Sequence, residues 1–220
     1  FVNRAIFFNF IKDKNIKPNK IIILNTEQLS RSERKFTKMI RFLARRKFII
    51  ADYSEENIQL YSKINNHIPF YKYNLNLPPY QKENYVCMIG NNSYRRNNLL
   101  KKIKDLKIPA KNIVGFGKPR DLKVMKSKIL VNCHYELEYN ILEQIRINPY
   151  VLNKLIVISE KSQQEDLCLI SKYVIFCDYD DIPSKVKEVY DNYDKYHEML
   201  FKSFNLEEFK ENKFLELFKK

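Results

Sequence analysis

Short apolar runs alternate with longer segments of mixed polarity along most of the chain. The runs are rich in Ile, Val and Leu and lack the polar alternation of a sheet with one solvated face. They therefore predict strands that are buried on both faces of a parallel sheet. The predicted strands cover residues 20–24, 47–52, 67–71, 85–89, 112–116, 128–132, 155–159 and 173–177.

Apolar positions recur at helical spacing in the segments around these strands. The predicted helices cover residues 2–11, 30–46, 97–106, 120–127, 139–152, 163–171, 181–200 and 204–218. Parallel strands that are joined by helices form right-handed βαβ units. The pattern therefore predicts an α/β fold, with a Rossmann-like parallel sheet domain preceded by a smaller α/β N-terminal part.

The segment 75–80 reads Leu-Asn-Leu-Pro-Pro-Tyr and has the strongest linker character in the chain. We place a domain boundary there. Residues 1–77 are expected to form the smaller α/β domain and residues 78–203 the Rossmann-like domain. Residues 204–220 carry aromatic side chains at helical spacing, and we expect this segment to be a helix that docks back on the N-terminal part.

The net charge of +14 is concentrated in the N-terminal part of the chain. Residues 1–50 hold 13 Lys or Arg against 3 Asp or Glu, whereas the remaining residues hold 27 against 23. The partner of this basic part could be nucleic acid, anionic lipid or a phosphorylated substrate. In the helix 30–46, the cationic positions lie mostly opposite the apolar ones, so two interpretations stay open: a solvated face, or a contact with an anionic surface.

Several protein classes find no support in the sequence. No apolar run reaches the roughly 18–20 residues of a membrane helix, and the N-terminal segment does not resemble a signal peptide. The cysteines lack zinc-site spacing and are interpreted as buried thiols of a cytoplasmic protein; they are Cys87, Cys133, Cys168 and Cys177. The acidic run 178–181 is interpreted as a helix cap rather than a metal site, so no metal and no cofactor are expected.

Polar residues and glycines gather where the predicted strands end. Gly90 and Asn91 follow one strand, and Arg95 and Arg96 stand before the next helix. A glycine, a helix start and arginines suit an anion, although a tight turn with exposed arginines would have the same sequence. The other two glycines of the chain, at 115 and 117, also fall at a predicted strand end, where a ligand could approach the backbone.

The segment 128–160 predicts a strand, a loop, a helix and a second strand. Ligands of such sheets bind at the carboxyl ends of the strands. The polar residues expected at this edge are Asn132, Cys133, His134, Tyr135, Ser159 and Glu160, with Glu143 and Arg146 from the helix. In the N-terminal part, Glu27 and Asp52 also follow predicted strands, and Ser54 is expected to cap a helix. For Glu27, a loop carboxylate or helix cap is the alternative to a functional role.

An ordered set of these segments resembles glycosyltransferases of the GT-B type, and is similar to small bacterial and large-virus sugar transferases over residues 20–190. The set comprises Asn25-Thr26-Glu27-Gln28, Asp52-Tyr53-Ser54-x-x-Asn57, Gly90 with Arg95-Arg96, Gly115-x-Gly117, residues 128–135 with Asn132-x-His134-Tyr135, Leu142-Glu143-x-x-Arg146-Ile147, and Ile158-Ser159-Glu160.

The resemblance implies that the second part holds a nucleotide-diphosphate sugar and transfers the sugar to a hydroxyl group of a glycan, lipid or protein. Glu143 would bind the ribose hydroxyls, and Gly117 would lie by the base. The implied nucleotide-sugar-binding residues are Gly90, Asn91, Arg95, Arg96, Gly117, Tyr135, Glu143 and Arg146. The base that activates the acceptor would be Glu27, Asp52 or His134. Metal ions are not implied, because arginines and a helix start can stabilise the leaving diphosphate.

The chain departs from the family pattern at two points. Tyr135 stands where the common pattern of two glutamates has its first carboxylate, which places the retaining mechanism of that subtype in doubt. The N-terminal part is also short, so the acceptor-side domain is expected to be reduced. Two other functions stay open: a nucleic-acid-binding protein that uses the basic helix, although no specific nucleic acid is expected, and a catalytically inactive domain that binds sugar or nucleotide.

Overall fold

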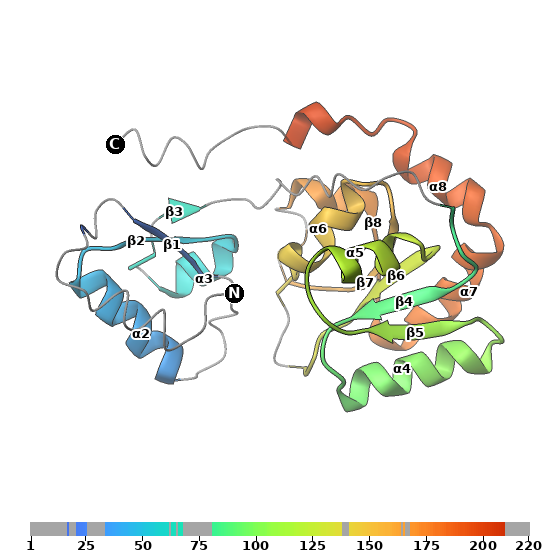
Figure 1. Ribbon diagram of the computed structural model, residues 1–220, viewed down its shortest axis with the longest axis horizontal. Coiled ribbons are helices and arrows are strands. Elements are labelled where there is room, and N and C mark those ends of the chain that lie inside the picture. Colours follow the sequence, from blue (N-terminus) through green and yellow to red (C-terminus); the bar gives the residue numbers. More distant parts are fainter. Residues whose placement is uncertain are drawn as a thin grey trace. The chain divides into compact units, whose positions relative to one another are not determined.

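The chain divides into two compact units in the computed structural model, Phe1–Pro69 with Asn212–Lys220, and Phe70–Glu211 (Figure 1). The structure describes residues 17, 21–25, 34–61, 63–64, 66–67, 81–137, 141–163, 165 and 168–209. The predicted helix 2–11, Glu27 and the predicted linker at 75–80 lie outside the described residues.

The first unit contains a small parallel sheet with the strand order β1-β2-β3. Its elements are β1 (Ile22–Asn25), α2 (Arg34–Arg45), β2 (Ile49–Asp52), α3 (Glu55–Leu60) and β3 (Asn66–His67). Its core joins Ile40 and Leu43 of α2 to Ile50 of β2. The prediction that Ser54 caps a helix is confirmed, because its side chain accepts a hydrogen bond from the Asn57 N–H at the start of α3.

The second unit is built on a five-stranded sheet in which all neighbouring strands are parallel. Its strands are β4 (Val86–Ile89), β5 (Ala110–Ile113), β6 (Ile129–Asn132), β7 (Ile156–Glu160) and β8 (Val174–Cys177). Its α-helices are α4 (Tyr94–Asp105), α5 (Lys118–Met125), α6 (Gln144–Val151), α7 (Ile182–Asp191) and α8 (Tyr193–Phe201), and its short 3-10 helices are η3 (Leu169–Tyr173), η4 (Tyr179–Asp181) and η5 (Leu206–Phe209). The predicted α/β class with a Rossmann-like sheet is confirmed.

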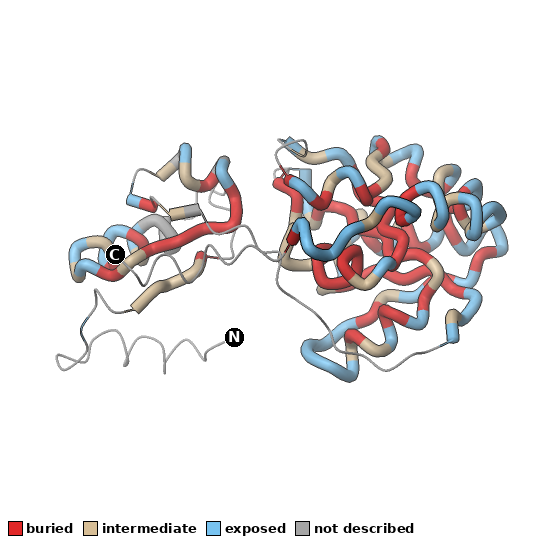
Figure 2. Tube along the Cα trace, turned by 90° about the horizontal axis from the view of Figure 1, so that it is seen from above, coloured by how far each residue is buried: buried red, intermediate tan, exposed pale blue. Residues whose placement is uncertain are grey.

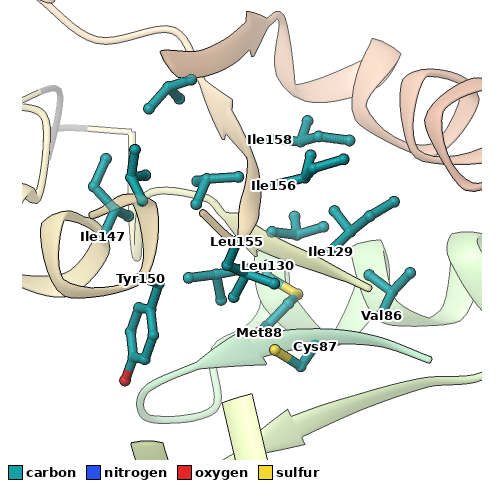
Figure 3. Close-up of a cluster of buried hydrophobic side chains, with 14 of the residues drawn as sticks. Val86, Cys87, Met88, Ile129, Leu130, Ile147, Tyr150, Leu155, Ile156 and Ile158 are labelled. Atoms are coloured by element: carbon teal, nitrogen blue, oxygen red, sulfur yellow. The ribbon is translucent and has the colours of Figure 1, made fainter. Parts of the chain in front are cut away.

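The apolar runs of the sequence form the inside of this sheet. Every residue of β4, β6 and β7 is buried, and exposed residues lie mainly along the surrounding helices (Figure 2). Ile147 and Tyr150 of α6 pack on one face, whereas Ile156 and Ile158 of β7 point to the opposite face (Figure 3). Helices α4 and α7 contact each other and cover that opposite face. The sheet is therefore buried on both faces, as its sequence pattern predicts.

The strand order β5-β4-β6-β7-β8 changes direction between β4 and β6. From β4 the chain continues to β5 on one side, and then crosses to β6 on the other side. In open α/β sheets such a switch point leaves a crevice at the carboxyl ends of the two strands, where ligands bind. The loops that follow β4 and β6 are therefore the first place to look for a site.

Helices α4, α5 and α6 begin at other residues than predicted, and α5 begins at Lys118 rather than at 120. Helix α4 begins at Tyr94 rather than at 97, because the Ser93 side chain accepts a hydrogen bond from the Arg96 N–H and so caps the helix. Helix α6 begins at Gln144 rather than at 139, so Glu143 precedes the helix instead of lying within it. Strand β5 ends at Ile113 rather than at 116, ahead of the left-handed backbone of Gly115.

The C-terminal predictions need larger corrections. The helix predicted over 181–200 is broken at Asn192 into α7 and α8, and the one predicted over 163–171 is replaced by the 3-10 helix η3. Of the segment 204–220, the described part contains only η5, and Phe204 and Phe209 pack on the core of the second unit. Tyr173 of the second unit offers these two residues an aromatic partner. That the segment 204–220 docks on the N-terminal part stays a prediction. Residues 210–220 lie outside the described residues.

Within the part of the chain that the structure describes, none of the helices combines the length and the apolar character needed to cross a membrane.

Candidate functional site

A buried arginine joins the two loops of the switch point. Arg96, on the first turn of α4, has only 2% of its surface exposed. Its Nη1 donates to the Asn91 carbonyl oxygen at 2.9 Å, in the loop after β4, and its Nη2 donates to the Cys133 carbonyl oxygen at 3.3 Å, in the loop after β6. Because backbone carbonyls are neutral, these bonds leave much of the guanidinium charge uncompensated.

Gly90 makes the space in which this guanidinium lies. A Cβ atom at Gly90 would be 2.8 Å from Arg96 Nη1, and the residue has a φ of +118° that side chains disfavour. The close neighbour of the Gly90 backbone is thus an arginine of the same chain, and contact of Gly90 with a ligand stays a prediction. Gly115 and Gly117 also have positive φ, and no heavy atom lies within 4 Å of a Cβ atom built at either.

Glu143 and Arg146 complete the polar cluster at the switch point. Arg146 forms an ion pair with Glu143 one helical turn earlier, and its Nη1 donates to Asn132 Oδ1 at 3.3 Å. The Glu143 carboxylate also lies 4.0 Å from Arg96 Nη2. Since about one fifth of the Glu143 and Arg146 side chains stays exposed, both are accessible from solvent while Arg96 is not.

Arg95 belongs to a separate ion pair beside this cluster. Its Nη2 and Nη1 donate to the two oxygens of Glu160 at 2.6 and 3.2 Å, and the same carboxylate accepts from the His134 backbone N–H at 2.9 Å. The guanidinium lies 4.2 Å from the ring centroid of Tyr179, whose hydroxyl donates to the Arg95 carbonyl oxygen. One carboxylate thereby holds together the ends of β6 and β7 and the start of α4.

The His134 side chain is buried and neutral. Its Nε2 lies 3.0 Å from the Lys161 carbonyl oxygen, so Nε2 carries the proton and donates. Nδ1 is then an acceptor, and it has no hydrogen-bond partner among the described residues. Burial lowers the pKa of the imidazole below its usual value of 6.5, so the ring stays uncharged at neutral pH. Only 3% of His134 is exposed, which limits its contact with a ligand.

The remaining predicted site residues of the second unit lie at the margin of this cluster. The Tyr135 ring centroid is 5.5 Å from the Arg96 guanidinium carbon. Gly117 precedes α5 at the end of β5, next to Phe116, which is 72% exposed. The structure thus brings eight predicted residues of this unit together and leaves Gly117 in the segment between the edge strand β5 and α5. The eight are Gly90, Asn91, Arg95, Arg96, His134, Tyr135, Glu143 and Arg146.

The charges at this edge nearly balance. Glu160 neutralises Arg95, and Glu143 neutralises Arg146, so Arg96 supplies the surplus positive charge. An incoming anion therefore meets arginines that already have carboxylate partners. The pairing of Arg95 with Glu160 is absent from the sequence interpretation, because the two residues are 65 positions apart and only the sheet order makes them neighbours.

Asp52 lies in the first unit and has a different character. Asn25 Nδ2, the Ser54 N–H and Asn57 Nδ2 donate to its carboxylate at 2.6, 2.8 and 3.1 Å. Burial raises its pKa from 3.8 to about 6, although these hydrogen bonds act in the opposite direction. With none of its surface exposed and both oxygens engaged, Asp52 ties β1 and β2 to α3, and its catalytic role stays a prediction.

The structure also bears on cysteine and metal chemistry. All four cysteines are free and buried, as predicted. Among the described residues, no group of three His, Cys, Asp or Glu side chains is arranged to hold a metal ion.

The chain is similar to proteins of Acanthamoeba polyphaga mimivirus. It is 33% identical to the uncharacterized protein R358 over 193 residues. The aligned region covers 84% of this chain and 68% of R358. It is 32% identical over 203 residues to the uncharacterized protein L138, covering 82% of this chain and 22% of L138. The uncharacterized protein L140 is 33% identical over 184 residues, covering 76% of this chain and 57% of L140. No family model and no solved structure matches the chain.

Proposed function

This chain belongs to the same family as the mimivirus protein R358, and we propose that it is a glycosyltransferase whose second unit binds a nucleotide-diphosphate sugar. One observation carries the proposal: Arg96, Arg146 and Glu143 converge at the switch point of a parallel sheet. The chain spans about two thirds of R358 and smaller shares of L138 and L140, so the proposal concerns the activity to which this part contributes.

The proposed roles follow from the chemistry of each group. Arg146 is partly exposed and forms the direct contact with the diphosphate, because a guanidinium can donate two parallel hydrogen bonds to phosphate oxygens. Arg96 stays buried behind it and adds positive charge as the leaving diphosphate develops negative charge. Glu143 releases Arg146 when the diphosphate binds, and its oxygens then accept hydrogen bonds from the two adjacent ribose hydroxyls.

The acceptor hydroxyl needs a base, and the three predicted candidates are Glu27, Asp52 and His134. Asp52 is fully buried and hydrogen-bonded, which favours Glu27 and His134 over Asp52 as the proposed bases. His134 is neutral and its buried Nδ1 has no hydrogen-bond partner among the described residues, so it can act as a base once a movement brings Nδ1 into contact with the acceptor. Glu27 lies outside the described residues.

Thermal unfolding with nucleoside diphosphates tests the binding step. A ligand that binds only the folded state stabilises it by RT ln(1 + [L]/Kd), which is about 2.7 kcal/mol at 100 times Kd. We expect one member of a panel of nucleoside diphosphates to raise Tm in proportion to the logarithm of its concentration. Release of that nucleoside diphosphate from its nucleotide sugar would then demonstrate turnover, whereas stabilisation without release would favour the inactive binding domain.

Three variants separate the roles of the site residues. Arg146→Gln removes a charged hydrogen-bond donor. It should weaken the binding of both the nucleoside diphosphate and inorganic pyrophosphate by about 10- to 100-fold. Glu143→Gln should weaken the binding of the nucleoside diphosphate, because it removes the ribose contact. It should strengthen the binding of pyrophosphate, because it removes an anion that competes for Arg146. The control is Lys126→Gln, which loses the same charge at the opposite edge of the sheet, next to Glu83. Absence of any stabilisation by the panel would refute the binding proposal.

A further inference from the structure

Helix α2 presents a row of cations on its outer side. Its apolar side chains Ile40 and Leu43 are buried in the core of the first unit, on strands β1 and β2. Lys38, Arg41 and Arg45 are exposed. They are spaced three and four residues apart, so they form one stripe along the helix surface, over about 10 Å of its length.

The stripe has no compensating negative charge in the described structure. Helix α2 contains no acidic residue, and none of its three exposed cations forms an ion pair with a described residue. The carboxylate of Asp52 is buried in its own hydrogen-bond network and does not face solvent. Like charges at these spacings repel one another on a helix. The stripe thus keeps a local repulsion that an anionic partner would relieve.

An apolar ring lies among these cations. Phe42 is 36% exposed, directly after Arg41 and one turn before Arg45 and Arg46. Lys47 follows in the left-handed conformation, with a φ of 61°, and is also exposed. Lysines and arginines that flank an exposed aromatic side chain are the combination that holds a helix at a membrane surface, where the charges meet lipid head groups and the ring enters the interface.

We propose that this face of α2, formed by Lys38, Arg41, Phe42 and Arg45, binds the surface of a membrane that contains anionic lipids. The exposed cations lie on one side of the helix, opposite the buried Ile40 and Leu43, which suits a flat anionic surface. Each cation near such a surface contributes about 1 kcal/mol, which is about fivefold in partition, so the three together contribute about 100-fold. The inference goes beyond the proposed function and does not depend on it.

Cosedimentation of the full chain with lipid vesicles tests the proposal. Vesicles of phosphatidylcholine alone are compared with vesicles that also contain phosphatidylserine. We expect binding only to the phosphatidylserine vesicles, and we expect it to weaken as salt is added, because surface charges are screened. The triple variant K38Q/R41Q/R45Q should lose about 100-fold in partition. Phe42→Ser, which leaves the charge unchanged, should also bind more weakly.

The matched control distinguishes a local stripe from net charge. The triple variant K101Q/K104Q/K123Q removes the same charge from exposed positions of α4 and α5 and should bind vesicles like the unchanged protein. Equal losses in the two triple variants would overturn the proposal, since net charge would then explain the binding. It would also be overturned if the unchanged chain ignored phosphatidylserine vesicles at low salt while binding a single-stranded oligonucleotide through the same three residues. Circular dichroism verifies folding, and Phe42→Ser preserves the test if a triple variant unfolds.

Discussion

Asp52 makes the first unit sensitive to pH. Burial raises the pKa of its carboxyl group to about 6, whereas the unfolded chain has a value near 3.8. The folded state therefore binds this proton more tightly than the unfolded state does. Between these two pH values the unfolded state loses the proton first, so the stability contribution of Asp52 is largest below pH 3.8 and falls as the pH rises towards 6.

This sign leads to a measurable expectation for the first unit. The free energy of unfolding of residues 34–61 should fall by roughly 2.4 kcal/mol between pH 4 and pH 7, because each pKa unit corresponds to about 1.4 kcal/mol and pH 4 already lies just above the unfolded pKa. The measurement is a urea series at each pH, with pulsed hydrogen exchange read on peptides from this segment. In Asp52→Asn, which cannot ionise, the fall attributable to this site should disappear. An identical pH dependence in the variant would show that another group is responsible.

Individual residues also show how far sequence reasoning reaches. The carboxyl ends of the strands could be predicted, and with them the neighbourhood of His134 and Glu143, because apolar runs mark buried strands. The pairing within that neighbourhood could not. Arg95 and Arg96 are adjacent in sequence, yet one pairs with Glu160 and the other is buried between backbone carbonyls. The start of α4 is set locally by Ser93, but the partners that decide which arginine turns inward lie far along the chain, Glu160 for Arg95 and the Cys133 carbonyl oxygen for Arg96.

The turn between β4 and α4 is held by several contacts that depend on one another. Asn112 of β5 donates to the Gly90 carbonyl oxygen at 2.8 Å and to Asn92 Oδ1 at 2.9 Å, which ties the turn to the neighbouring strand. Ser93 caps the helix, and the Arg96 guanidinium donates a hydrogen bond to the Asn91 carbonyl oxygen. The turn is therefore preorganised by its own chain, with Arg96 filling the space that Gly90 leaves.

A pair of glycine variants can measure this arrangement. Gly115→Ala places a Cβ in open space at a φ of +111°, so it should cost only the backbone strain, about 1–3 kcal/mol. Gly90→Ala adds a contact of 2.8 Å with Arg96 and should cost about 1–3 kcal/mol more, since it disturbs hydrogen bonds of a buried charge. Urea unfolding of the second unit gives both values. Equal losses in the two variants would mean that Arg96 moves aside freely.

Element boundaries illustrate a second limit of sequence reasoning. Strands β4, β6 and β8 are predicted within one residue at each end, because their composition is almost wholly apolar. Strand β5 contains Lys111 and Asn112 and lies at Ala110–Ile113 rather than at the predicted 112–116. The start of α4 could have been found from Ser93, a favoured N-cap residue that accepts from the third following N–H. The start of α6 at Gln144 has no such signal, since Glu143 precedes it without a side-chain cap. Helical periodicity alone extended the predicted helix over the loop.

At the scale of the whole molecule, the two units differ greatly in the core that stabilises them. In its described residues, the first unit has three short strands and a core centred on a few residues such as Ile40, Leu43 and Ile50. The second unit buries five strands between helices on both faces. Because the fraction of surface that is buried on folding increases with the size of a domain, the second unit should be considerably more stable.

Unfolding of the full chain should therefore occur in two steps. We expect the amide hydrogens of β1 and β2 to exchange at lower urea concentration than those of β4, β6 and β7, measured by hydrogen exchange and mass spectrometry. A nucleoside diphosphate that binds at the switch point should raise only the second transition, because Arg96, Arg146 and Glu143 all belong to the second unit. A single transition for both units would contradict the expected independence of their cores. If the nucleoside diphosphate stabilised only the first unit, the assignment of the nucleotide site to the second unit would be contradicted.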